Sequence, residues 1–178
     1  MIQLLPDLQA QLAFETYPDT PAIEGVSLNP LRKHRSSNGW FMEFARFSAG
    51  VLEGSSTGFE LRQTSVSFAE AGRINAFHIH TKKPQNEIWT VIHGQLLVWL
   101  VDCRHDSSTA GVRHSVVLSG EQPMHLYIPA GVAHGYKAGS SGATLLYAMD
   151  QQFDINDPNE GRLPWDVFGA ALWNEDKG

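Results

Sequence analysis

Three histidines and a glutamate stand at spacings that suit a metal site. His78 and His80 are two residues apart, Glu87 follows after a gap of six residues, and His134 comes directly after a Pro129–Ala133 turn segment. Side chains at i and i+2 of a β-strand share one face, so His78 and His80 can bind one ion from the same side. Imidazole and carboxylate ligands suit zinc, iron, manganese, nickel or copper, and this set of ligands does not choose among those metals.

The same residues also have a purely structural interpretation. His78 and His80 can line the polar interior of a barrel without binding anything. A buried cluster of three imidazoles and a carboxylate still requires an explanation, because burying unpaired polar groups costs free energy. The remaining histidines lie in loops, near turns or among core positions, and we assign them no function: His34, His93, His105, His114 and His125.

Short segments of alternating apolar and polar residues predict the strands that position these side chains. The expected strands are 73–81, 87–92, 95–103, 114–118, 124–128 and 143–149. His93–Gly94 is predicted to form a tight turn, and strict alternation puts Ile74 and Ala76 on the face of His78. Strands that recur at this spacing are typical of an antiparallel sandwich or barrel, so the expected class is all-β.

The composition excludes several classes of protein. The chain has 178 residues with 19 acidic and 13 basic side chains, a net charge of -6, and we expect a single domain over residues 1–178. An acidic balance argues against nucleic-acid and anionic-membrane partners. The longest apolar run, Leu96–Val101, is too short to span a bilayer, the N-terminus has no basic leader, and Cys103 is the one cysteine. We therefore expect a soluble, cytoplasmic protein.

Two segments together resemble the motifs of the cupin superfamily. Residues 72–94 run from a glycine through His78, His80 and Glu87 to a second glycine, and residues 129–134 read PAGVAH. The resemblance implies a double-stranded β-helix, that is, a cupin or jelly-roll barrel, and such barrels often hold a metal on three histidines and a glutamate. The gap between His80 and Glu87 is longer than is usual in that motif.

Further segments match one group of cupin-type barrels more closely. Residues 101–111 (VDCRHDSSTAG) and 128–136 (IPAGVAHGY) are similar to the patterns VDLRxxSPTxG and IPxGxAHGF, and Tyr147 lies thirteen residues after His134 as it does there. Residues 38–43 (NGWFME) and 63–67 (QTSVS) are similar to RGxFxE and NxSxS. Over about residues 36–165 the chain thus resembles the dTDP-4-dehydrorhamnose 3,5-epimerase family.

That resemblance implies proton abstraction beside the C4 ketone of a nucleotide-linked 4-keto-6-deoxy sugar. By position, His78 matches the base of the family and Tyr147 the acid that reprotonates the opposite face. A histidine suits the role of base because its unperturbed pKa is near 6.5. The family orients its base with an aspartate near the C-terminus, for which Asp176 is the nearest match and Asp166 the second.

Substrate contacts follow partly from the resemblance and partly from strand alternation. The resemblance places Glu43, Gln63 and His134 in contact with the substrate. Trp89 shares a predicted strand face with Glu87 and so lines the same pocket. Arg73 is one of five basic residues that would hold an anionic group of the substrate, together with Arg62, Lys82, Lys83 and Lys137.

Four positions depart from the family pattern. Its two arginines are replaced by Asn38 and Asn75, its glutamine by His80, and its enolate-stabilising lysine by Glu87. These changes remove cations from a site for a diphosphate and complete the metal-ligand set His78, His80, Glu87 and His134. A metal could act as a Lewis acid in place of the lysine. A ring nitrogen of His78 that binds a metal cannot also act as a free base, so the two roles exclude each other.

Three hypotheses about function remain open at this point. The first is an isomerase, a sugar epimerase similar to the rhamnose-pathway enzymes. The second is another metal-dependent cupin enzyme, either a small-molecule isomerase or a dioxygenase, and the third is a cupin that binds sugars without turnover. For each of these a small sugar or nucleotide sugar is the expected ligand, and a homodimer is expected because a small barrel has sheet edges to cover.

Overall fold

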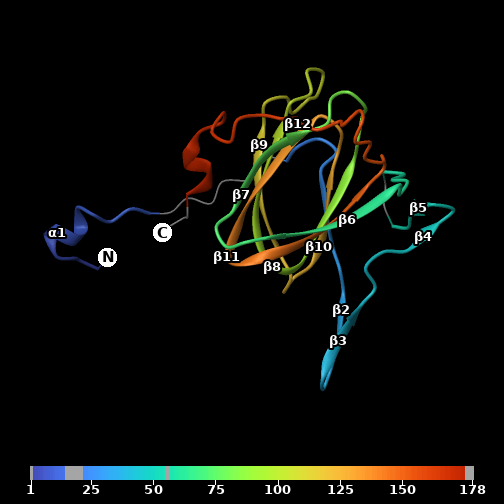
Figure 1. The fold of residues 1–178 in the computed structure, drawn as a ribbon. Coiled ribbons are helices and arrows are strands. Elements are labelled where there is room, and N and C mark those ends of the chain that lie inside the picture. Colours follow the sequence, from blue (N-terminus) through green and yellow to red (C-terminus); the bar gives the residue numbers. More distant parts are fainter. Residues whose placement is uncertain (1, 15–21, 55–56, 175–178) are drawn as a thin grey trace.

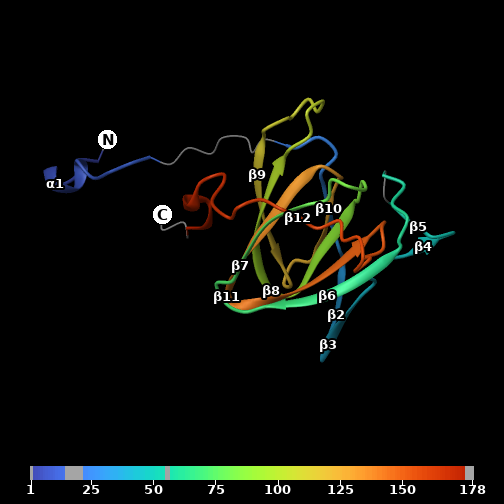
Figure 2. The same ribbon diagram turned by 45° about the horizontal axis from the view of Figure 1, so that its top comes forward.

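The computed structural model describes residues 2–14, 22–54 and 57–174. Its main body is a barrel of curved strands (Figure 1). Helix α1 (Pro6–Gln9) lies apart from this barrel, and the hairpin of β2 (Lys33–Ser36) and β3 (Gly39–Met42) projects from it. Figure 2, turned by 45°, shows the same separation of helix and hairpin from the barrel.

The barrel consists of eight strands of very unequal length. In chain order they are β1 (Ser27–Pro30), β6 (Gln63–Ala69), β7 (Ile74–Ile79), β8 (Glu87–Asp102), β9 (Arg113–Ser119), β10 (Met124–Ile128), β11 (Val132–Met149) and β12 (Gly161–Arg162). The short hairpin of β4 (Phe47–Ser48) and β5 (Val51–Leu52) precedes them, and a 3-10 helix (Ala170–Trp173) follows.

The strands pair in the order β1-β10-β8-β11-β7-β12, with β6 added to β11 and β9 added to β8. Every one of these pairs is antiparallel. The long strands β8 and β11 pair with each other from Val132–Asp102 to Met149–Glu87 and pass through both layers of the barrel. This is the all-β jelly-roll barrel, or double-stranded β-helix, that the sequence predicts.

Alternation along the strands fills the barrel with apolar side chains. On β8, for example, Leu96, Val98 and Leu100 are fully buried and belong to the main core cluster. Two smaller clusters lie outside the barrel wall: the 45–61 segment packs on Ile88 and Tyr127, and the C-terminal Trp173 packs on Phe77. The core therefore occupies most of the interior and leaves one end of the barrel for polar groups.

The predicted turn at His93–Gly94 is wrong, because β8 continues through it as one strand. Gly94 has a φ of 72° and faces Gly142, whose φ is 68°. An added Cβ at Gly94 would lie 1.9 Å from the Gly142 carbonyl oxygen. The glycines thus mark a bend where β8 and β11 approach each other closely, and a bend of this kind has the same local sequence signal as a turn.

The alternation predicted for residues 73–81 is also wrong at one point. His134 pairs with His78, but Tyr136 pairs with Asn75, so two residues of β7, Ala76 and Phe77, lie opposite the single residue Gly135 of β11. This is a β-bulge, and it is possible because Gly135 lets the strands approach, with an added Cβ only 3.0 Å from the Cα of Ala76. Cross-strand partners share a face, so Asn75, rather than Ile74 or Ala76, shares the interior face with His78.

No helix among the described residues is long and apolar enough to cross a membrane. The eight strands, from residue 27 to residue 162, belong to one sheet system. That all of residues 1–178 form one domain stays a prediction, since part of the N-terminal segment lies outside the described residues.

We predict that Gly94→Ala destabilises the barrel more than Gly111→Ala. Both glycines have a positive φ, which costs an alanine about 1 kcal/mol, but Gly111 has no atom within 4 Å of an added Cβ. At Gly94 the clash with the Gly142 carbonyl adds at least about 2 kcal/mol. Urea unfolding of the two variants measures the difference, and equal losses of unfolding free energy would contradict a close approach of β8 and β11.

Candidate active site

The polar end of the barrel gathers the three histidines that the sequence singles out. His78 on β7 and His134 on β11 are register partners, and His80 lies just beyond the end of β7. One ring nitrogen from each of the three lies within 4.8 Å of the others. His80 and His134 are almost completely buried. The strand pairing thus brings together residues that are more than fifty positions apart in the chain.

Glu87, at the start of β8, is held by hydrogen bonds. Its Oε1 accepts from His80 Nε2 at 2.8 Å and from Gln85 Nε2 at 2.8 Å, and its Oε2 accepts from Trp89 Nε1 at 2.6 Å. Burial alone would raise the pKa of Glu87, but His134 and the bonds from His80 and Trp89 lower it to about 2. The carboxylate is therefore ionised, and it lies outside the group of three histidines whose ring nitrogens converge.

His80 forms the cationic half of this buried pair. Burial is the largest single effect and favours the neutral form, but the hydrogen bond and charge of Glu87, together with the Asn159 carbonyl and the charge of Glu160, outweigh it and raise the pKa of His80. Its Nδ1 donates to the backbone carbonyl of Asn159. Both ring nitrogens of His80 are thus occupied, as expected for an imidazolium paired with a carboxylate.

His78 presents a free nitrogen to the interior. Its Nδ1 lies 3.4 Å from a carboxylate oxygen of Glu160, and its Nε2 is buried without a hydrogen-bond partner among the described residues. Burial and the positive charge of Arg162 lower the pKa of His78 to about 4. Glu160 favours the tautomer with the proton on Nδ1, which leaves Nε2 of a neutral imidazole with its lone pair.

His134 also has a buried ring nitrogen without a partner, as His78 does. Its Nδ1 donates to the Val132 carbonyl at 3.0 Å, and its Nε2 is buried without a hydrogen-bond partner in the described part of the chain. Burial lowers the pKa of His134, so the ring is neutral. The Trp89 ring stands edge-on to it, with centroids 5.0 Å apart. Trp89 therefore lines the same interior face as Glu87, as alternation predicts.

Tyr147 reaches the interior from the second half of β11. It pairs in register with Trp89 of β8 and Ser65 of β6. Burial raises the pKa of Tyr147 above its usual value, while a hydrogen bond with Ser65 acts in the opposite direction. The phenol is thus protonated at neutral pH and can donate a proton. Gln63 lies two residues before Ser65 and donates to its hydroxyl at 3.3 Å, so it borders the same wall.

The segment after β11 covers the histidine cluster, and sequence patterns did not reveal this. The Asn159 side chain accepts from the Lys82 backbone N–H at 2.9 Å and donates to the Lys83 carbonyl at 2.6 Å. Strand β12 follows and pairs Arg162 with His78. A cavity of about 30 Å³ remains here, lined by Gln85, Met149, Asn159 and Glu160 among others.

The carboxylate beside His78 is therefore Glu160, a residue that sequence reasoning missed. Asp166 is exposed and lies in the turn that ends at Gly169, while Asp176 lies outside the described residues. The region has little periodicity, and β12 is only two residues long. The nearby turn-forming sequence Asn156–Pro158 predicts a change of chain direction, but it does not predict which of the following side chains faces the barrel.

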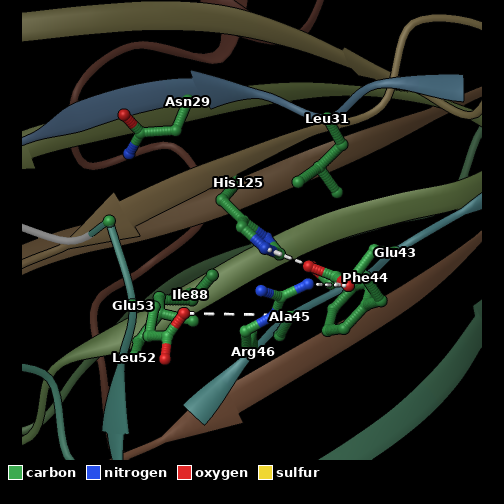
Figure 3. Close-up of a pocket in the computed structure, with 11 residues that line it drawn as sticks. Asn29, Leu31, Glu43, Phe44, Ala45, Arg46, Leu52, Glu53, Ile88 and His125 are labelled. Atoms are coloured by element: carbon green, nitrogen blue, oxygen red, sulfur yellow. Dashed lines mark hydrogen bonds and ion pairs between the residues drawn. The ribbon is translucent and has the colours of Figure 1, made fainter. Parts of the chain in front are cut away.

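Two other candidate residues lie away from the cluster within this chain. Arg73 is exposed in the turn before β7, five residues from His78, which is roughly 16 Å along a strand. Glu43 lies on the outer face of the barrel, in a pocket of about 410 Å³ (Figure 3). There it pairs with Arg46 at 2.7 Å, near His125, which donates to the Phe44 carbonyl.

Residues 20–169 match the sequence profile described as dTDP-4-dehydrorhamnose 3,5-epimerase. The chain belongs to the dTDP-4-dehydrorhamnose 3,5-epimerase family. It is 37% identical over 154 residues to the spore coat polysaccharide biosynthesis protein SpsL of Bacillus subtilis, covering 85% of this chain and 97% of that protein. It is 28% identical over 147 residues to the dTDP-4-dehydrorhamnose 3,5-epimerase of Methanothermobacter thermautotrophicus, covering 82% and 76% of the two chains.

Membership in the epimerase family is supported by structural similarity. The dTDP-4-dehydrorhamnose 3,5-epimerase of Bacillus anthracis, solved with TDP and PPi bound, matches with a TM-score of 0.71 at 26% identity over 82% of this chain and 83% of that chain. The family and the jelly-roll fold expected from the sequence are thus confirmed. The dTDP-4-dehydrorhamnose 3,5-epimerase family is metal-independent, and the His80–Glu87 pair occupies the positions where its pattern has glutamine and lysine.

Proposed function

We propose that this protein is a sugar epimerase that acts on a nucleotide-linked 4-keto-6-deoxy sugar. The observation that carries the proposal is the position of His134 in a chain of the epimerase family: its ring lies 6.2 Å from the His78 ring and 5.0 Å from the Trp89 ring, and Trp89 is the register partner of Tyr147. One similar structure, from Legionella pneumophila, is solved in complex with dTDP-4-keto-L-rhamnose. A nucleotide sugar is accordingly the ligand we assign to this site.

His78 acts as the base in this proposal. Its Nε2 has a lone pair and no partner among the described residues, and it faces the interior. It would take a proton from the carbon next to the C4 ketone, and the electrons of the C–H bond would form the enolate. The imidazolium that results gains a favourable interaction with Glu160, 3.4 Å from Nδ1. We therefore propose Glu160 as the residue that orients His78, in place of Asp176 or Asp166.

Tyr147 acts as the acid. Because burial keeps its phenol protonated, it can return a proton to the same carbon from the other face, which inverts the configuration. Trp89, Gln63 and His134 line the space between the two groups and are proposed to contact the sugar. A hexose is larger than the cavity of about 30 Å³ beside Glu160, and we propose that residues 151–160, which line much of this cavity, move when the sugar binds.

The test is proton exchange at C3 and C5 of dTDP-4-keto-6-deoxyglucose in heavy water, followed by NMR. We expect His78→Gln to reduce deuterium incorporation about 10²- to 10⁴-fold, because the base is lost. Tyr147→Phe should retain exchange but form at least about 100-fold less epimerised product. His105→Gln is the matched control, since His105 is almost fully exposed and, among the described residues, bonds only Asp106. A wild-type protein without deuterium incorporation would contradict the proposed activity.

A second candidate function is a metal-dependent cupin enzyme. The observation in its favour is that ring nitrogens of His78, His80 and His134 lie within 4.8 Å of one another, and that two of them are buried without partners in the described structure. Glu87 could join them as a fourth ligand, and the hydrogen bonds from Gln85 and Trp89 would then orient the ligating carboxylate. A divalent ion held by these residues would supply Lewis-acid chemistry at a carbonyl.

Elemental analysis of the purified protein separates the two candidates. A metal enzyme would contain about one zinc, iron, manganese or nickel ion per chain, and His80→Gln would lose it while His105→Gln would not. Metal well below one ion per chain, with full exchange activity, would contradict the second candidate. His78 cannot be both the base and a metal ligand through the same nitrogen, so the measured metal content tests both candidate functions.

We also propose that the protein is a homodimer. The β2–β3 hairpin projects from the barrel and exposes Trp40 and Phe41 by 51% and 66%, and the outer face of β6 exposes Val66 and Phe68 by 63% and 61%. Apolar surface of this kind is typical of an interface. Sedimentation should give about twice the chain mass of 19.7 kDa, and less for Phe68→Glu. A mass of one chain at micromolar concentration would contradict the dimer.

The cytoplasmic location expected from the sequence stays a prediction.

A further inference from the structure

An anionic ligand at this end of the barrel needs a cation, and most cations nearby are already paired. Lys82 and Lys83 both lie 3.1 Å from carboxylate oxygens of Asp157, and Arg62 lies 2.9 Å from Glu60. The buried His80 offers no positive charge to a ligand, because its charge is already paired with the Glu87 carboxylate. A diphosphate would therefore have to displace an ion pair at each of these residues.

Arg162 differs from Lys82, Lys83 and Arg62 in the groups that it bonds. Its Nη1 donates to Asn75 Oδ1 at 3.0 Å and to the Ala76 carbonyl at 3.3 Å, both of them uncharged acceptors. No carboxylate pairs with it among the described residues. Its Nε and Nη2 make no hydrogen bond in that part of the chain either, and its side chain is exposed. The guanidinium is thus anchored at one nitrogen and available at the others.

Its place in the sheet directs Arg162 toward the candidate base. Arg162 is the register partner of His78, and cross-strand partners point to the same face of a sheet. The bulge in β7 turns Asn75 to that face as well, which explains how Arg162 reaches it. The guanidinium lies close enough to His78 for its charge to lower the pKa of that histidine. An anion bound by Arg162 would lie at the rim, beside the position of the sugar.

We infer that Arg162 binds the diphosphate of the substrate and determines the specificity of this site for nucleotide-linked sugars. It supplies from β12 the guanidinium that Asn75 does not supply from β7, where the sequence pattern of the family has an arginine. An arginine fork suits a phosphate because two parallel N–H groups can donate to two oxygens. This inference rests on the proposed function for the identity of the ligand, but binding can be measured without turnover.

Calorimetric titration with dTDP and with inorganic pyrophosphate tests the inference directly. We expect Arg162→Gln to raise the Kd of dTDP roughly ten- to a hundred-fold, because a charge-assisted pair of hydrogen bonds is lost. Arg162→Lys should give a smaller increase, since it keeps the charge but not the fork. Arg113→Gln is the matched control, because Arg113 also donates to a carbonyl, that of Phe168, but on the outside of the barrel.

A relocation variant makes the test sharper. If the guanidinium matters by its position, the double variant Asn75→Arg with Arg162→Gln should recover dTDP affinity to within about tenfold of the wild type, because the two side chains are in contact. Thermal unfolding of each variant checks that the barrel is intact. Should Arg162→Gln fail to fold, the comparison of Arg162→Lys with the relocation variant still decides.

The outcomes separate this inference from the proposed function. Equal Kd values for wild type, Arg162→Gln and Arg113→Gln would overturn it, as would no binding of dTDP or pyrophosphate by the wild type at millimolar concentration. A shifted pH profile of exchange with unchanged Kd and KM would also overturn it, because Arg162 would then act only through His78. Arg162-dependent dTDP binding without any proton exchange would support the inference and reject the epimerase activity.

Discussion

The pairing of β8 with β11 is the constraint on which the rest of the structure depends. The two strands pair antiparallel over almost their full length, and both pass from one layer of the barrel to the other. Because β11 runs away from the polar end and returns to it, His134 near its start and Tyr147 near its end lie at the same end of the barrel. The bend between them requires the close approach of Gly94 and Gly142. Because β11 supplies both His134 and Tyr147, the relative position of these two side chains depends on the glycines at the bend, which lie far from either residue.

Sequence periodicity predicted the parts of the fold that depend on local alternation. The strands around His78, Leu96 and Tyr147 were predicted, as was the gathering of His78, His80 and His134. The bend at Gly94 and the bulge at Asn75 were not, because each depends on how closely a distant strand approaches, at Gly142 and at Gly135. A bulge inserts one extra residue, so every side chain beyond it points to the opposite face from the one that strict alternation predicts. The strand itself is then predicted correctly, but its faces are assigned wrongly.

The contributions of the C-terminal segment were missed for a different reason. Glu160 and Arg162 lie in a stretch with little periodicity, and their neighbours are set by pairing with the edge of β7. The charge of a side chain is visible in the sequence, but its partner is not. Lys82 and Arg162 look equivalent as cations in the sequence, yet only the first is paired with a carboxylate in the described structure.

One segment that resembles the family pattern, residues 101–111, has a structural role. The Asp102 carboxylate is buried and accepts from Arg104 Nε at 2.9 Å, from Ser107 Oγ at 2.6 Å and from Thr109 Oγ1 at 2.6 Å. Glu24 accepts from the other side of the same loop. These bonds shape the connection between β8 and β9 and touch none of the histidines. Resemblance in this loop therefore indicates the barrel rather than the substrate.

The chemistry must be argued from the polar end of the barrel, where the charges differ from the family pattern. A lysine in the place of Glu87 would offer a cation to an enolate, whereas here the Glu87 carboxylate pairs with His80 at 2.8 Å and accepts a hydrogen bond from Trp89. Among the described histidines of this cluster, the ring nitrogens that are buried without a hydrogen-bond partner are the Nε2 atoms of His78 and His134. In the proposed reaction His78 uses its Nε2 as the base, and His134 then faces the sugar with a neutral Nε2, because its one ring proton is donated from Nδ1 to the Val132 carbonyl. Glu87 Oε2 lies 3.7 Å from His134 Nε2 and favours a positive charge there, but burial outweighs this effect and lowers the pKa of His134. The changes at positions 80 and 87 therefore replace the cation of the family pattern by a buried ion pair beside a neutral imidazole.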